Sequence, residues 1–100
     1  MPARRARRFP VNIPAAIGGA ELPDGSVDAW LINVSEEGCC VRLPATHRDA
    51  LPAGSENICV EAESGTVRGR VVWSHNTDRG VAFSRDERNR DSVRSLLKKL

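Results

Sequence analysis

The sequence predicts a mainly β fold: an antiparallel barrel or sandwich of about six short strands, followed by one C-terminal helix. Three observations predict it. Apolar residues alternate with polar ones along most of the chain, turn residues separate these segments at hairpin spacing, and the apolar period becomes helical near the C-terminus. With 100 residues, the chain is long enough for one domain with a single core.

The alternating segments give the expected strands in chain order. They are Phe9–Ile17, Val27–Ile32, Cys39–Leu43, Ile58–Glu63, Val67–Ser74 and Val81–Phe83. Pro10 and Pro14 lack the N–H that a strand ladder needs, so we expect the first strand to lie at an edge or to pair incompletely. In the fifth strand, alternation places four residues on one face: Val67, Gly69, Val71 and Trp73.

The connections are marked by turn residues. Pro44 ends the third strand, and residues 45–54 are expected to form a loop anchored by Leu51. Ser64-Gly65 predicts a tight hairpin, and Asp78-Arg79-Gly80 predicts the turn into the last strand.

The C-terminal segment predicts an amphipathic helix that covers one opening of the β structure. Its apolar stripe consists of Val93, Leu96, Leu97 and Leu100. Ser84 and Glu87 have the spacing of a capping box, and Asp86 would lie favourably at the positive end of the helix dipole.

Charge is distributed unevenly although the net charge is only +2. Four arginines lie within residues 4–8, and no acidic residue precedes Glu21. A concentrated basic segment on a nearly neutral chain indicates a local anionic target rather than general nucleic-acid binding. The 4 % aromatic content also argues against a base-stacking nucleic-acid surface.

Several classes of protein are disfavoured. No apolar run is long enough to span a membrane, and no apolar segment of a secretion signal follows the basic N-terminus, so we expect a cytoplasmic protein. The 3 cysteines are expected to remain reduced thiols, with the adjacent Cys39 and Cys40 on opposite faces of a strand. Neither His47 nor His75 has zinc-ligand spacing from a cysteine, so we expect no metal, no cofactor and no catalytic site.

The segment Asn33-Val34-Ser35-Glu36-Glu37-Gly38 connects the second and third expected strands. Asn33 can bond its own backbone two residues on, and Gly38 is expected to supply a conformation that side-chained residues avoid. Alone, this segment is typical of an ordinary turn. Its combination with the arginine cluster Arg4-Arg5-Ala6-Arg7-Arg8 favours a specific pocket over a general basic arm.

These two segments resemble the signature motifs of the PilZ domain, a six-stranded antiparallel β-barrel that senses the bacterial second messenger cyclic di-GMP. The family motifs are Arg-x-x-x-Arg before the first strand and Asp/Asn-x-Ser-x-x-Gly between the second and third. The resemblance extends from Arg4 to Phe83 and includes the rhythm of Val71-Val72-Trp73 and Gly80–Phe83. It implies one domain with a flexible arm at residues 1–8, the barrel at residues 9–85 and the helix at residues 86–100.

The resemblance also implies a set of ligand-binding residues. Arg4 and Arg8 would bind cyclic di-GMP, and Arg5 would add a further contact. A guanidinium suits this role because it pairs bidentately with phosphate or guanine and stacks on a base. Asn33 and Ser35 would bond a guanine edge, and Gly38 would let the backbone approach. Trp73 either offers an aromatic face or packs in the barrel. Many members of the family have an acidic residue at the position of Asn33. A neutral amide accepts hydrogen bonds from guanine less strongly than a carboxylate does.

The expected function is therefore a cyclic di-GMP receptor that changes conformation and regulates a downstream protein partner. One alternative is an adaptor of the same fold that binds proteins and ignores nucleotide. A second alternative is a nucleic-acid binder that uses the arm and the basic C-terminal segment, which would show a steep salt dependence.

Overall fold

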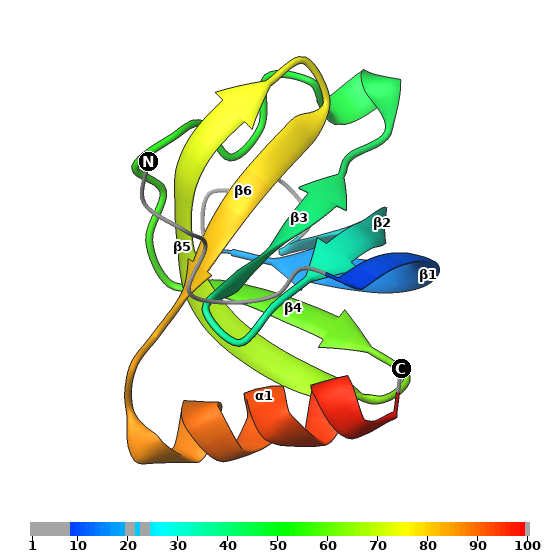
Figure 1. Cartoon of the computed structure of the whole chain (residues 1–100). Helices are drawn as coiled ribbons and strands as arrows, with labels where there is room; N and C mark the ends of the chain where they lie inside the picture. The colour runs from blue at the N-terminus through cyan, green and yellow to red at the C-terminus, as the bar shows by residue number, and fades with distance from the viewer. Residues whose placement is uncertain (1–8, 20–21, 23–24, 100) are drawn as a thin grey trace, which may run out of the picture.

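The structure, a computed structural model, describes residues 9–19, 22 and 25–99. The expected arm, residues 1–8, and Leu100 lie outside the described residues. The strands are β1 (Phe9–Gly18), β2 (Ser26–Val34), β3 (Gly38–Arg42), β4 (Ile58–Ala62), β5 (Gly65–His75) and β6 (Asp78–Phe83). All neighbours are antiparallel, and the order β1-β2-β3-β6-β5-β4 closes into a barrel (Figure 1). The predicted fold class is confirmed, as a barrel rather than a sandwich.

Alternate residues of the strands fill the barrel, because successive side chains of a strand point to opposite faces. The most deeply buried apolar side chains of the strands are each at most 2 % exposed: Ile17, Leu31, Val34, Cys39, Val41, Ile58, Val60, Val67 and Val71. None of the three cysteines forms a disulfide. Apolar side chains of all six strands therefore meet in the barrel interior.

The first strand pairs incompletely on one side. Its ladder with β2 runs the length of β1, whereas its ladder with β4 covers only Ala15 to Gly18. Pro10 and Pro14 both lie in the part without a β4 partner, so their missing N–H groups remove no bond to β4. This confirms the pairing expected from the prolines.

Two hairpin turns lie one or two residues away from their predicted positions. The β5–β6 turn is Asn76-Thr77 rather than Asp78-Arg79-Gly80, because Asn76 adopts the positive φ of 53° that a tight turn requires. Asp78 begins β6 and pairs with both Arg42 and His75. The β4–β5 turn is Glu63-Ser64, and Gly65 is the first residue of β5. The expected loop after Pro44 includes a short 3₁₀ helix, η1 (Ala45–His47).

Helix α1 (Glu87–Lys98) packs against β5 at one end of the barrel (Figure 1). Val93 and Leu96 of the predicted stripe are buried, and Leu97 is half-buried. The N-cap is Asp86 rather than the expected Ser84, because the Asp86 carboxylate accepts from the main-chain N–H of Asn89 at 2.8 Å.

The buried Asn89 fixes the helix to the barrel. Its side-chain oxygen accepts from the Arg68 N–H at 2.7 Å, and its amide nitrogen donates to the carbonyls of Arg68 and Ser84 at 2.9 and 2.8 Å. The amide therefore pairs with the backbone of β5 as a further strand would. Because both ends of the amide are satisfied, this polar residue is accommodated at 3 % exposure.

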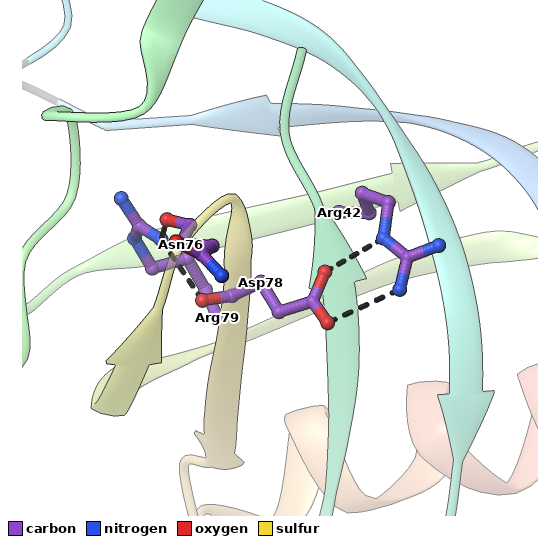
Figure 2. A network of polar contacts seen from close by, with 4 residues as sticks. All are labelled: Arg42, Asn76, Asp78 and Arg79. Carbon is purple, nitrogen blue, oxygen red and sulfur yellow. Dashed lines mark hydrogen bonds and ion pairs between the residues drawn. The ribbon is translucent and has the colours of Figure 1, made fainter. Parts of the chain in front are cut away.

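The guanidinium of Arg79 holds the loop after β3 against the β5–β6 hairpin. The side chain is 2 % exposed, and every donor is satisfied by a main-chain carbonyl. Nε donates to Leu51 at 2.8 Å and to Ala50, and the Nη atoms also contact the carbonyls of Ala50 and Arg48. The Nη atoms donate further to Asn76 at 2.7 Å and to Asp78 (Figure 2). Burial lowers the pKa of Arg79, while the charges of Asp49 and Asp78 oppose that effect.

The same hairpin carries an ion pair on the outer face of the barrel. Arg42 of β3 donates two hydrogen bonds to the Asp78 carboxylate, at 2.7 and 3.2 Å (Figure 2). This pairing lowers the pKa of Asp78 below its ordinary value of 3.8. Arg42 is solvent-exposed and Asp78 partly so, and we therefore expect the pair to add little to stability.

Candidate functional site

A row of residues across four strands brings Asn33 and Trp73 to the same face of the barrel. The strand registers pair Asn33 with Cys40, Cys40 with Gly80, and Gly80 with Trp73. The adjacent row consists of Val34, Cys39, Val81 and Val71, all in the core. Because neighbouring rows point to opposite faces, the row containing Asn33 lies on the outside of the barrel.

Two irregularities in the strands put Asn33 and Trp73 on that outer face. From Leu31 to Asn33, β2 advances two residues while its partner β3 advances one. From Val71 to Trp73, β5 likewise advances two residues while β6 advances one. Each is a β-bulge, which inserts one extra residue and reverses the inward and outward alternation beyond it. The prediction that Trp73 shares a face with Val71 is therefore wrong.

The indole of Trp73 lies over Gly80 on β6. It is 41 % exposed, so it does not pack in the barrel interior. A Cβ at Gly80 would overlap the indole ring, so only glycine leaves room for the ring to lie flat against β6. Cys40, the next residue in the row, is 4 % exposed although it faces outward from the barrel. We estimate that Asn33 and Trp73 are roughly 14 Å apart along the sheet, since neighbouring strands are about 4.8 Å apart.

Ser35 organises the turn after β2. Its hydroxyl accepts from the N–H groups of Glu37 and Gly38, both at 3.2 Å, and donates to the Gly38 carbonyl at 3.2 Å. Its own N–H donates to that carbonyl at 2.8 Å. Ser35 is 2 % exposed. A hydroxyl has one donor and two acceptor positions, and all three are used within the turn.

Gly38 is required by close packing rather than by an unusual backbone conformation. It is absent from the described glycines with positive φ, which are Gly25, Gly54 and Gly65. This corrects the expectation drawn from the turn pattern. A Cβ at Gly38 would instead overlap the carbonyl oxygen of Val81, because β3 and β6 approach each other closely there.

Replacing Gly38 by alanine is expected to destabilise the fold by about 1–3 kcal/mol, because the added methyl group meets a backbone atom that only a strand movement can displace. Denaturant unfolding followed by circular dichroism measures this change. Gly18→Ala is the matched control, since a Cβ at Gly18 would make only ordinary contacts at 3.6 Å. Equal stability of the two variants would contradict the close-packing explanation.

The three arginines Arg4, Arg5 and Arg8 lie outside the described residues. The strand that follows them begins beside the other predicted residues: Phe9 is opposite Val34, and Pro10 is opposite Asn33. The arginine segment is followed directly by β1, and β1 begins next to the end of β2. Asn33, Ser35, Gly38 and Trp73 are all described, and Asn33 lies within β2 rather than in the turn.

Across residues 9–19, 22 and 25–99, no group of three His, Cys, Asp or Glu side chains is placed to hold a metal ion. No described helix combines the length and hydropathy needed to cross a bilayer.

A sequence model of the PilZ domain matches residues 2–99. The chain belongs to the PilZ domain family. This match includes the arginine motif as well as the whole barrel and α1. A comparison with curated protein sequences finds no match.

Solved structures share the PilZ fold. The PilZ domain of CeSA from a cellulose-synthesizing bacterium aligns with a TM-score of 0.67 and 19 % identity, covering 93 % of each chain. MrkH of K. pneumonia in complex with c-di-GMP aligns with a TM-score of 0.64 and 16 % identity, and the motility inhibitor MotI/DgrA of Bacillus subtilis with 0.61 and 12 %. These two alignments cover 99 % of this chain but only 52 % and 51 % of theirs, so this chain spans about half of their length.

Two residues of the site region were not identified as such from the sequence. Gly80, assigned to a turn, is instead the position against which Trp73 lies, and a glycine inside an alternating segment was the available signal. Arg79, assigned to the same turn, is buried and holds the hairpin that carries Gly80. No local pattern distinguishes a buried arginine from an exposed one in a turn.

Proposed function

We propose that this PilZ domain is a cytoplasmic receptor for cyclic di-GMP that regulates a downstream protein and catalyses no reaction. The observation that carries the proposal is the shared outer face of Asn33 and Trp73, beside the start of β1 that follows the arginine motif. Both family motifs are complete in the sequence, and MrkH, which has the same fold, forms a complex with c-di-GMP.

The chemistry of each group suits one part of the ligand. Arg4 and Arg8 supply guanidiniums that pair with the phosphates or with guanine O6 and N7, and Arg5 adds a further contact. Asn33 offers an amide to a guanine edge. Trp73 offers an exposed aromatic face on which a base can stack, which is worth about 1–3 kcal/mol in single-strand complexes.

Ser35 and Gly38 contribute mainly by shaping the turn. Ser35 reaches a guanine edge only if the ligand replaces one of the hydroxyl's bonds to Glu37 or Gly38. Gly38 allows β3 to lie close to β6. It thereby positions β3, the strand on which Cys40 pairs with Asn33. When the arginine segment binds the ligand, its contacts change the surface that the domain offers to a partner.

Calorimetric titration with cyclic di-GMP tests the proposal, with GTP and the linear dinucleotide as controls. We expect saturable binding to cyclic di-GMP and none to the controls, and the stoichiometry shows whether one nucleotide or a pair is bound. A flat trace from folded protein would favour the other candidate function, an adaptor that binds proteins without nucleotide. The exposed Trp30, at 48 %, is the observation that supports an adaptor surface.

A further inference from the structure

A second surface of the domain has the features of a protein-docking groove. It has a volume of about 1170 Å³ and lies where β1 loses its β4 partner. One wall comes from residues 13–16 of β1 and the other from residues 61–64 at the β4–β5 turn, with Trp30 and Pro44 beside them. A groove of this size can hold a short peptide segment.

The groove presents an exposed aromatic side chain. Trp30 is 48 % exposed and lies directly opposite the exposed Pro14 on the neighbouring strand. Ala16, which pairs with Asp28 on β2 and with Glu61 on β4, is the small apolar residue on the same outer face, whereas Ala15 and Ala29 belong to the core. An exposed indole offers a surface on which an apolar group of a partner can pack, and tryptophan is enriched among the residues that dominate interface energies.

The rim of the groove carries mostly one sign of charge. Asp28, Glu61 and Glu63 are exposed along it, against the single cation Lys99. Among the residues that the structure describes, none of these three carboxylates forms an ion pair. An acidic rim repels nucleic acid and anionic lipid surfaces and attracts lysine or arginine.

We propose that this groove, the Trp30 groove, binds a segment of a partner protein that inserts an apolar side chain beside Trp30 and places lysine or arginine against Asp28, Glu61 and Glu63. The inference does not depend on nucleotide binding. Trp30 and Asn33 lie three residues apart on β2, or about 10 Å at the rise of a strand. The groove is nevertheless distinct from the proposed nucleotide site, because none of Asn33, Ser35, Gly38 and Trp73 lines it.

Nuclear magnetic resonance tests the groove directly, because Trp30 and Trp73 are the only two tryptophans and give two indole N–H signals. The probe is a short synthetic peptide with central leucines flanked by lysines, and a version flanked by glutamates is the charge control. We expect the lysine peptide to shift the Trp30 indole signal and the amides of residues 28–30 and 61–64. The Trp73 signal should not shift, and the glutamate peptide should have no effect.

Substitutions then separate the groove from general attraction. Trp30→Ala and Glu61→Lys should each weaken binding of the lysine peptide about tenfold or more, the size of a hot-spot effect. Glu56→Lys makes the same charge change at an exposed position outside the groove and should have little effect. If the domain is a receptor, both groove variants should bind cyclic di-GMP as the wild type does. The peptide titration therefore tests the groove, and the nucleotide titration tests the receptor function, independently of each other.

Three results would overturn the inference. One is a Trp30 signal that does not move at saturating peptide. Another is equal weakening by Glu56→Lys and Glu61→Lys, which would indicate attraction to net charge only. The third is a Trp30-dependent dimer in sedimentation, which would show that a second copy of this chain occupies the groove.

Discussion

Replacing Arg79 by methionine is expected to lower the free energy of unfolding by about 3–5 kcal/mol, because several main-chain carbonyls lose their donor and each buried acceptor left unsatisfied costs about 1–3 kcal/mol. The guanidinium satisfies main-chain carbonyls of the loop after β3 and of the β5–β6 turn, including those of Leu51 and Asn76. Methionine has a similar length but no donors, so these carbonyls lose their partners in a site that water reaches poorly. Leu51, buried with a positive φ of 53°, would lose the contact that holds its backbone.

Denaturant unfolding measures the effect of Arg79→Met, with Arg70→Met as the matched control. Arg70 is exposed on the neighbouring strand β5, so its replacement should change stability by less than about 0.5 kcal/mol. The Arg79 variant should also show faster amide hydrogen exchange in residues 48–51, because the loop loses its attachment to the hairpin. If the two variants unfold at the same denaturant concentration, the buried network does not stabilise the fold.

Replacing Arg8 by alanine is expected to reduce the affinity for cyclic di-GMP by more than tenfold. If the guanidinium is desolvated against the ligand, its removal costs on the order of 2–5 kcal/mol, and about 1.4 kcal/mol corresponds to tenfold. Arg8 is the second arginine of the family motif and is followed directly by β1, whose second residue, Pro10, is opposite Asn33. It is therefore the motif arginine closest in sequence to Pro10.

Calorimetry with Arg88→Ala as the control isolates this effect from net charge. Arg88 is exposed on α1 and lies far along the chain from both motifs. Its replacement by alanine removes the same charge as Arg8→Ala does. We expect its binding curve to match that of the wild type. An Arg8→Ala curve that overlays the wild type would exclude the arginine motif as the ligand contact.

The order and type of the elements could be predicted from the sequence because they depend on local patterns. Alternation predicted every strand, the prolines predicted the incomplete pairing of β1, and the apolar stripe predicted α1. The exact turns and the helix cap were less predictable, since several neighbouring residues could serve and the choice depended on long-range pairing. Asp78, for example, is held in β6 by Arg42, a residue distant in the sequence.

The faces of the candidate site residues were decided only by the tertiary structure. Continued alternation would place Asn33 with Leu31, and Trp73 with Val71, inside the barrel. The bulges before both residues turn them outward. At Val71 the backbone bonds to Gly54 and Ser55 at 2.7 and 2.8 Å, so a loop distant in sequence helps fix the strand there. A bulge arises when the partner strand advances one residue fewer, and that mismatch exists only once the strands are paired.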